Sequence, residues 1–452
     1  MKKLLLGIVI MLLIIIAFLV AIKLFPMYAS RLPALFLLLL LDLYLWFPFK
    51  RWANVKKSLI RQLVSKLFWL PFVLFLTFFA FLAIYPLTDN NKMLRTYWLG
   101  FVIIIYISKL IPFVFFLLSD LLCFIKKVYA HIFEKPVERK IRKSKFLVCM
   151  GLFFGSVAFI GLFVGMTSWA YKFKVKQEII PLANLPEGFD GLRIVQISDL
   201  HLGSWTSTKA MQKAVKMIND LNPDMIFFTG DLVSFQTNEA YPFENQLKKI
   251  KSKYGVFSVL GNHDYGDYSQ WNTPAAKAKN ANDLIDFQKR LGWKLLNNQN
   301  WIVKKDNNDS LNLENEIAIV GVENWSSHAR FKKRGNLEKA LLGTEGVPLK
   351  LLLSHDPTHW EKQVNGKHPD IDVTFSGHTH GMQLGIEFWG IKWSPAQWMY
   401  KYWAGLYSSN SGSKKKQYLY VNRGLGNIAY PGRVGMAPEI TLVVLKKVTN
   451  SY

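Results

Sequence analysis

The sequence is short of cysteine and of acidic residues, and each shortage narrows the class of protein. Its only two cysteines, Cys123 and Cys149, lie in or beside long apolar runs. The rest of the chain therefore has no disulfide framework, which neither supports nor excludes an oxidising compartment. Acidic residues number 31 against 56 Lys and Arg, which gives a formal net charge of +25 over 452 residues. Such an excess could indicate nucleic acid as a partner if it were gathered on one folded domain.

The positive charge is instead concentrated in the first part of the chain. Residues 1–176 carry 24 Lys and Arg against 5 Asp and Glu, whereas residues 177–452 carry 32 against 26. In the first part the basic residues punctuate apolar runs and form no continuous stripe, so we expect no nucleic-acid partner. Half of all residues are hydrophobic, and together with the length this indicates a composite protein.

Long apolar runs dominate residues 1–172 and predict a multi-pass, all-α membrane bundle. About 20 helical residues cross the hydrocarbon core, and five runs reach about that length: residues 4–22, 32–49, 67–86, 97–116 (or on to Ile125) and 146–171. The first could be a cleaved signal peptide, but no small-residue cleavage site follows Val20, which favours a retained anchor. Asp42, Lys109 and Asp120 lie within or at the ends of these runs and leave a transport role open.

The loop charges predict the orientation of the chain in a bacterial inner membrane. Basic residues cluster between the second and third runs and between the fourth and fifth, and the other two loops hold few of them. Because basic loops stay in the cytoplasm, five spans place everything after Tyr171 in the periplasm or outside the cell. A missed or split span would reverse this result.

The second half of the chain has the pattern of an α/β domain. Residues 173–191, with Pro181, Pro186 and Gly188, predict a connector before a folded domain at 192–447. Short apolar runs typical of buried strands follow at 192–197, 225–229, 256–260, 317–322, 349–353 and 373–375. Ser207 could cap a helix with an apolar face at Met211, Ala214, Val215, Ile218 and Leu221. Strands that alternate with helices indicate an α/β fold.

Five polar blocks each begin where one of these apolar runs ends. In chain order they are Asp199-Leu200-His201, Gly230-Asp231, Gly261-Asn262-His263-Asp264, Ser354-His355 and Gly377-His378-Thr379-His380. Side chains at the ends of neighbouring strands converge at one edge of a sheet, where α/β proteins commonly bind ligands. This supply of carboxylate, amide and imidazole ligands indicates a two-metal hydrolytic site.

The ordered blocks resemble the calcineurin-like metallophosphoesterase superfamily, whose pattern runs D-x-H, G-D, G-N-H-[DE], H and G-H-x-H. The resemblance implies two mixed sheets packed face to face in a four-layer αββα sandwich, whereas the strand pattern alone leaves a single doubly wound sheet open. Residues 422–427 and 430–433 resemble a membrane-associated branch that includes UDP-diacylglucosamine pyrophosphatases. Met382 departs from that branch, which usually has glycine there, and could narrow the pocket.

The same resemblance implies a role for each residue of the blocks. Asp199, His201 and His380 would hold one divalent ion, Asn262, His355 and His378 the second, and Asp231 would bridge them. Zinc, manganese and iron all suit such ligands, and the ions would lower the pKa of bound water to generate the attacking hydroxide. His263 would give a proton to the leaving oxygen, with Asp264 as its orienting group. Arg423 and Arg433 could bind phosphate, unless each pairs with an acidic neighbour.

The predicted function is that of a membrane-anchored, metal-dependent phosphoesterase. Its substrate would be a phosphorylated envelope lipid or lipid-linked precursor. One alternative is a UDP-2,3-diacylglucosamine-type pyrophosphatase of lipid A synthesis, and another is a scaffold or transporter without enzymatic activity. The aromatic stretch at 387–407 either meets the membrane interface or packs under a long loop.

Overall fold

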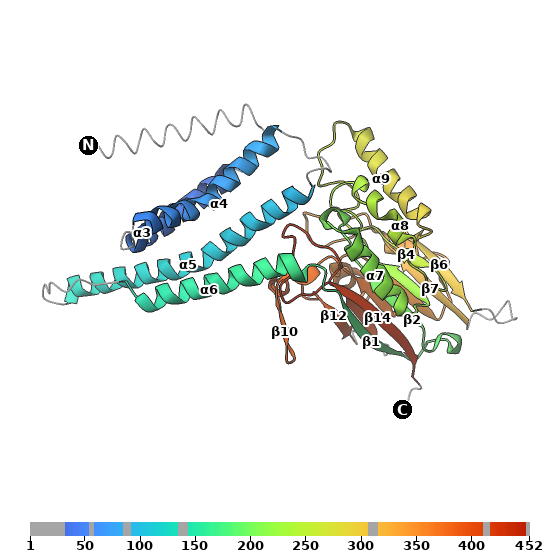
Figure 1. The fold of residues 1–452 in the computed structure, drawn as a ribbon. Coiled ribbons are helices and arrows are strands. Elements are labelled where there is room, and N and C mark those ends of the chain that lie inside the picture. Colours follow the sequence, from blue (N-terminus) through green and yellow to red (C-terminus); the bar gives the residue numbers. More distant parts are fainter. Residues whose placement is uncertain are drawn as a thin grey trace. The chain divides into compact units, whose positions relative to one another are not determined.

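The computed structural model describes residues 32–53, 58–84, 92–133, 143–305, 315–409 and 416–448. The chain divides into two compact units, Met1–Phe163 and Val164–Tyr452. The first is helical and the second contains the sheets (Figure 1). Each unit is described by itself.

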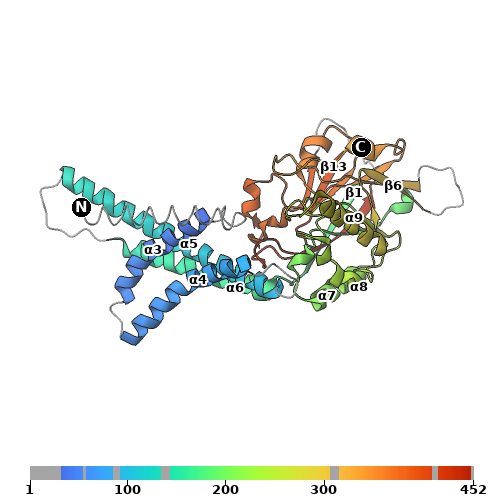
Figure 2. The same cartoon turned by 90° about the horizontal axis from the view of Figure 1, so that it is seen from above.

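The helical unit consists, in its described part, of four long helices. They are α3 (Leu32–Ala53), α4 (Ser58–Ile84), α5 (Lys92–Phe133) and α6 (Lys145–Val164), seen from a second direction in Figure 2. Leu45, Phe75 and Tyr106 join α3, α4 and α5 in one apolar cluster. Gly155 of α6 lies against Pro112 of α5, where an added Cβ would come within 2.9 Å of the proline ring. Small residues of this kind let membrane helices approach closely.

Three of the described helices are long and apolar enough to cross a membrane. These candidate spans are Leu59–Thr77, Thr96–Phe133 and Lys145–Trp169, fewer than the five predicted. The predicted run at 4–22 lies outside the described residues. The run at 32–49 coincides with α3, which is not among the three. Its Asp42 is fully buried against other helices, so this helix is not a uniformly apolar span.

The three charged residues noted in the apolar runs, Asp42, Lys109 and Asp120, each have a charged partner. Lys109 Nζ lies 2.6 Å from Asp42 Oδ1, and the Tyr106 hydroxyl donates to Asp42 Oδ2 at 2.9 Å. Asp120 accepts a hydrogen bond from the Tyr44 hydroxyl at 2.7 Å and also pairs with Lys143. Paired charges are the usual way to tolerate ionised groups inside a bundle. These contacts account for all three charges without a transport function.

The second unit is built on two six-stranded mixed sheets. The first has the order β1 (Lys174–Leu182), β14 (Glu439–Lys447), β2 (Arg193–Ile197), β3 (Met225–Phe228), β4 (Val256–Ser258) and β5 (Lys294–Leu295). The second has the order β12 (Gly405–Ser409), β13 (Gln417–Val421), β9 (Val373–Ser376), β8 (Leu349–Leu353), β7 (Glu316–Gly321) and β6 (Gln299–Lys304). Strands β2 to β5 are mutually parallel, as are β7, β8, β9 and β13.

Three buried clusters show how the layers pack. Ile194, Phe227 and Leu351 belong to the cluster between the two sheets. On the outer face of the first sheet, helices α7 (Thr208–Asp220) and α9 (Pro274–Arg290) add Met211 and Leu284 to a second cluster, on the side seen in Figure 1. Helix α10 (Leu337–Leu341) and the short helix Trp360–Val364 cover the outer face of the second sheet. Two mixed sheets covered in this way are consistent with the αββα sandwich.

The predicted strands and the predicted capped helix are present. Each of the six apolar runs overlaps a strand, from β2 through β9. Ser207 accepts a hydrogen bond from the Ala210 amide at the start of α7, and Met211 and Ile218 of its apolar face are buried. The apolar runs therefore predicted the buried strands correctly, because a strand that is buried on both faces requires a continuous apolar sequence.

The predicted connector at 173–191 is wrong for its first half. Lys174–Leu182 forms β1, which pairs in parallel with β14 along nine residues. Toward the strand end its exposed residues alternate with buried ones, as expected for a strand at the edge of a sheet. Pro181 is compatible with this position, because proline occurs in edge strands.

Candidate metal centre

The ends of parallel strands from both sheets bring the predicted ligands together. Asp199, Asp231 and Asn262 follow β2, β3 and β4 of the first sheet, and His355 and His378 follow β8 and β9 of the second. Gln196 ties the two sheets together here, since its Nε2 donates to the Ser376 carbonyl at 2.9 Å. The predicted convergence is thus produced by two sheets that meet at their carboxyl edges.

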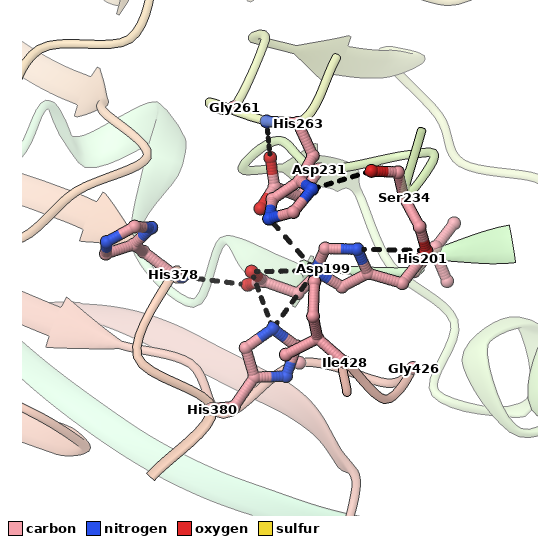
Figure 3. A network of polar contacts seen from close by, with 12 residues as sticks. Asp199, His201, Asp231, Ser234, Gly261, His263, His378, His380, Gly426 and Ile428 are labelled. Atoms are coloured by element: carbon pink, nitrogen blue, oxygen red, sulfur yellow. Dashed lines mark hydrogen bonds and ion pairs between the residues drawn. The ribbon is translucent and has the colours of Figure 1, made fainter. Parts of the chain in front are cut away.

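The ligand atoms form two groups. Asp199, His201 and His380 offer one atom each within a mutual 4.8 Å, and so do Asp231, His355 and His378. In the first group His201 Nε2 lies 3.1 Å from His380 Nε2, and His380 Nε2 lies 3.3 Å from Asp199 Oδ1. Figure 3 shows these side chains pointing toward one another. Each group has the size and chemistry of a site for one divalent cation.

A single oxygen of Asp231 links the two groups. Asp231 Oδ2 lies 3.5 Å from His201 Nε2 in the first group and 3.2 Å from His355 Nε2 in the second. Its other oxygen accepts the His263 amide at 2.8 Å, which fixes the carboxylate plane. A carboxylate placed in this way can contact two cations at once, as a dinuclear site requires.

Two buried oxygens at the centre that accept no hydrogen bond from a described residue also fit metal ions. Asp199 Oδ1 and Asn262 Oδ1 are buried and have no hydrogen-bond partner among the described residues. Asn262 uses its Nδ2 to donate to the Tyr268 hydroxyl at 2.9 Å, and this contact fixes which way the amide faces. A buried oxygen without a partner is costly, and a cation would satisfy both of these oxygens.

The backbone at the centre is held in an unusual conformation. Several non-glycine residues there have positive φ, and these are Asp199, His201, Asp231, His378 and His380. Non-glycine residues adopt this region infrequently and at an energetic cost, and such residues cluster at functional sites. The tight loops need glycine beside them: a Cβ on Gly261 would lie 2.2 Å from Asp231 Oδ1, and one on Gly377 would lie 2.3 Å from Asp199 Oδ2.

The centre matches a known family along the segment that carries its ligands. Residues 192–382 match the calcineurin-like phosphoesterase family, and residues 28–169 match the family described as a probable calcineurin-like phosphoesterase, transmembrane domain. The UDP-2,3-diacylglucosamine pyrophosphatase LpxG of Chlamydia trachomatis serovar D is 30% identical over 293 residues, which cover 54% of this chain and 81% of that protein. The chain belongs to the calcineurin-like metallophosphoesterases. Its phosphoesterase domain is preceded by a segment that matches that family's transmembrane domain.

Two further relatives of this metallophosphoesterase each match about three fifths of the chain. A transmembrane protein with metallophosphoesterase domain from Danio rerio is 31% identical over 290 residues, 63% of this chain. The match covers 60% of that relative's own length. The uncharacterized metallophosphoesterase YkuE of Bacillus subtilis is 28% identical over 283 residues, which cover 61% of this chain and 86% of YkuE.

Burial and charge set the protonation of the metallophosphoesterase centre. Burial alone would raise the pKa of Asp231, but His355 and His263 nearby hold that pKa well below its usual range. For His355 burial opposes the charged form, yet Asp231 raises the pKa of its imidazole to about 10. Burial lowers the pKa of His201 and brings that of His378 to about 4. The negative charge of Asp231 that stabilises the protonated form of His355 would also attract a metal cation.

Metal binding is therefore expected to release at least one proton near neutral pH. Below its pKa of about 10 the metal-free His355 holds a proton, which must leave before the nitrogen can coordinate a metal ion. Apparent metal affinity should fall about tenfold for each pH unit lowered in this range. Calorimetric titration of Mn²⁺ in two buffers of different ionisation enthalpy measures the proton count. Identical heats in both buffers would contradict the expectation.

Asp356 and Tyr400 contact the candidate ligand His378, and the sequence did not reveal these contacts. His378 Nδ1 lies 3.1 Å from His355 Nε2, so this nitrogen faces the metal group. Its Nε2 lies 3.0 Å from the Tyr400 hydroxyl and 3.4 Å from Asp356 Oδ2. His355 is held similarly, with Nδ1 2.7 Å from the Thr229 carbonyl. Such partners fix the tautomer and the ring orientation of a ligand histidine.

We expect Asp356→Asn to weaken metal binding about 10- to 100-fold, the usual effect of losing a partner of a ligand histidine. The carboxylate is buried, and although burial opposes its charge, His378 keeps its pKa low. The neutral amide would leave His378 less basic. Metal content after dialysis against graded chelator measures the change. Asp220→Asn on the exposed end of α7 is the matched control, and equal retention by both variants would contradict the assigned role.

The predicted catalytic pair is arranged differently from the prediction. His263 Nδ1 lies 2.7 Å from the Ser234 carbonyl, which orients the ring. Asp264 instead accepts the amides of Asp231 and Gly261 at 2.9 Å each, and those of Leu232 and Val233. Burial and the charge of Asp231 raise the pKa of Asp264 to about 7. Asp264 thus shapes the loops that carry Asp231 and Asn262.

The two predicted phosphate-binding arginines already have partners. Arg423 forms a bidentate pair with Glu387, at 2.7 and 2.9 Å, and lies 3.4 Å from Glu439. This is the acidic pairing that the sequence left open. Arg433 is fully buried, donates to the Gly426 carbonyl and places Nη2 3.3 Å from His380 Nδ1. The contacts of both side chains favour a structural role.

Proposed function

We propose that this metallophosphoesterase hydrolyses a phosphoester or pyrophosphate bond in a membrane lipid or lipid-linked precursor. The observation that carries the proposal is the position of Arg433. Its amide donates to the Gly165 carbonyl at 3.2 Å, within the candidate span Lys145–Trp169, and its guanidinium reaches His380 of the metal centre. Arg433 therefore contacts both a candidate metal ligand and the end of a candidate membrane span. A lipid headgroup is the substrate that such a centre would meet first.

A basic pocket beside the centre supports an anionic substrate. It has a volume of about 220 Å³ and adjoins the candidate ligand Asn262. Four cationic side chains and a single carboxylate line it: Lys277, Arg330, Lys332, Arg334 and Asp267. Asp267 pairs with three of these cations but can neutralise only one charge. The remaining positive charge favours a second phosphate or another anionic part of the substrate.

The residues of the chain can be given steps in this reaction. Bound at the two groups, divalent ions would polarise the phosphoryl oxygens and acidify a water molecule. Asp231 would hold the two groups in register through one oxygen. The Ser234 carbonyl fixes His263 Nδ1, so Nε2 is the nitrogen from which a proton can pass to the leaving oxygen. Tyr268, whose ring centroid lies 4.3 Å from that of His263, limits the movement of the imidazole.

An extracytoplasmic site is the second part of the proposal. Eight basic residues precede or begin α6 between Lys126 and Lys145, and few lie between α4 and α5. Since a basic loop stays in the cytoplasm, one crossing by α6 would place residues after Trp169 outside. This argument uses only the last span, so it does not depend on a total of five. A cysteine at Leu342 that reacts with an impermeant maleimide in intact cells would support this side, and one that reacts only after lysis would reverse it.

The substrate class is tested with the full chain in phospholipid nanodiscs. Bis-p-nitrophenyl phosphate, p-nitrophenyl phosphate, phosphatidyl-p-nitrophenol and UDP-2,3-diacylglucosamine are compared with Mn²⁺, Zn²⁺ or Fe²⁺. Preference for phosphatidyl-p-nitrophenol over the soluble diester supports a lipid substrate. Preference for UDP-2,3-diacylglucosamine favours the pyrophosphatase alternative, as in LpxG. No turnover with any of these would leave the scaffold alternative as the better account.

A further inference from the structure

A β-hairpin with an exposed apolar face extends from the phosphoesterase domain. Strands β10 (Ile386–Phe388) and β11 (Ile391–Trp393) pair in antiparallel register. Trp389 and Gly390 form the two-residue turn, both with positive φ, as tight hairpin turns require. Figure 1 shows the hairpin standing away from the two sheets.

The hairpin exposes large apolar side chains to an unusual extent. Trp389 at the tip is 89% exposed, and Ile386, Phe388 and Ile391 are 54%, 63% and 64% exposed. Phe388 and Trp389 stack on one another, with ring centroids 5.2 Å apart. Trp398, close by in sequence, is 74% exposed. Contiguous apolar surface of this kind marks a site of interaction.

One face of the hairpin is polar and the other is apolar, and the contacts of the polar face determine which face points away from the domain. Side chains alternate across a strand, so Glu387 and Lys392, which are directly paired, lie opposite the apolar face. Glu387 is bonded to Arg423 and to Lys176. Lys392 donates to the Ala404 carbonyl. The polar face is therefore fastened to the body of the domain, and the apolar face is left outward.

The base of the hairpin is attached to the end of the last candidate span. Leu384 forms a bridge with Val434, and the Gly385 amide donates to the Val434 carbonyl at 2.9 Å. The preceding residue, Arg433, donates to Gly165 of the span. A Cβ on Gly165 would lie 2.7 Å from Val434 Cγ2, so this contact is close-packed. The hairpin thus begins where the chain leaves the span.

We propose that the apolar face of this hairpin, with Trp389 at its tip, inserts into the interface of the membrane that the chain spans. Tryptophan and other aromatic residues favour that interface. The described side chains of the outward face, Ile386, Phe388 and Ile391, are apolar, so insertion would depend on apolar contact and little on lipid charge. The hairpin follows the metal ligand His380 by six residues. An inserted hairpin would hold the metal centre at headgroup depth, a consequence that rests on the proposed lipid substrate.

The insertion is tested by fluorescence, independently of any activity. The full chain, with Cys123→Ala and Cys149→Ala, carries an environment-sensitive label at Trp389→Cys or at Leu342→Cys. Leu342 is a matched control, since it is apolar and 68% exposed but lies outside the hairpin. In phosphatidylcholine nanodiscs, a spin-labelled phosphatidylcholine should quench the label at 389 severalfold more than the label at 342.

Two outcomes would overturn the proposal. If iodide in the water quenches both positions equally and the spin-labelled lipid quenches neither, the hairpin stays in water. If the label at 389 is shielded from iodide without lipid quenching, the face is covered by protein, either a second copy or another partner. Preserved metal content in the labelled chains would show that the domain remains folded.

A kinetic comparison tests the consequence for lipid substrates. In Phe388→Ser/Trp389→Ser, the ratio of kcat/KM for phosphatidyl-p-nitrophenol to that for bis-p-nitrophenyl phosphate should fall about tenfold. Leu342→Ser should leave the ratio unchanged. An unchanged ratio in the hairpin variant, with lipid quenching present, would overturn the coupling to substrate but leave the insertion standing. Absence of hydrolysis in the unmodified chain would instead count against the proposed function.

Discussion

Asp231→Asn is expected to lower kcat/KM for bis-p-nitrophenyl phosphate about a thousandfold, on the scale of the several kcal/mol that metal ions contribute to such reactions. Asp231 Oδ2 is the atom shared by the two ligand groups. An amide at this position keeps the contact with the His263 backbone but loses the charge between the two cations. The bound metal, measured by mass spectrometry, should fall from two ions to one or none.

A control substitution that removes a carboxylate outside the metal centre shows whether the loss of activity is specific to Asp231. Asp283→Asn removes an acid on the exposed side of α9, where it pairs with Lys279, and should leave activity and metal content unchanged. The thermal midpoint of the metal-free Asp231→Asn chain should be lower than that of the parent, because the substitution leaves the buried, protonated His355 without its charged partner. Activity within tenfold of the parent would be incompatible with a bridging carboxylate.

His263→Gln is expected to lower kcat by about a hundred- to ten-thousandfold for a poor leaving group, the usual range for loss of a general acid. Two metal ions should remain bound, since His263 is in neither ligand group. The loss should depend on the leaving group. Diphenyl phosphate releases the more basic phenolate and needs a proton, whereas bis-p-nitrophenyl phosphate releases a stable anion and should be affected much less.

This dependence separates proton donation from a structural effect of the same change. Ser234 holds the His263 ring through its backbone carbonyl, so no side-chain substitution at Ser234 can remove that contact. Tyr268→Phe keeps the ring beside His263 and loses only the hydroxyl near Asn262, which makes it a suitable companion variant. An equal loss with both diesters in His263→Gln would show that His263 does not protonate the leaving oxygen.

The sequence was informative about this site because its candidate ligands follow buried strands, which can be recognised from the sequence. A buried strand requires a continuous apolar run, and β2, β3, β4, β8 and β9 were recognised from theirs. Residues that follow neighbouring parallel strands lie at the carboxyl edge of their sheet, and Asp199 and Asp231 do so in the first sheet and His355 in the second. The glycines were also informative, since Gly261 and Gly377 stand where a side chain would collide with a ligand.

Residues that act through a ligand were missed because nothing local distinguishes them. Tyr400 lies 22 residues beyond His378, in an aromatic stretch that the sequence could only describe by composition. The structure divides that stretch: Tyr400 and Trp403 are buried, whereas Trp389 and Trp398 are exposed. For Asp356 the sequence offered one indication, which is that this residue directly follows the candidate ligand His355. The proximity of a carboxylate to His378 still depends on two loops of different strands.

Hydrophobicity and spacing along the chain were enough to predict the long apolar helices, the α/β pattern and the blocks that carry the candidate metal ligands. Tertiary structure alone decided that β1 joins the sheet at 174–182, that Asp264 holds backbone amides, and that Arg423 pairs with Glu387. It also decided which aromatic residues face outward at the hairpin. Each of these outcomes depends on contacts between segments far apart in the chain, and no local pattern encodes such contacts.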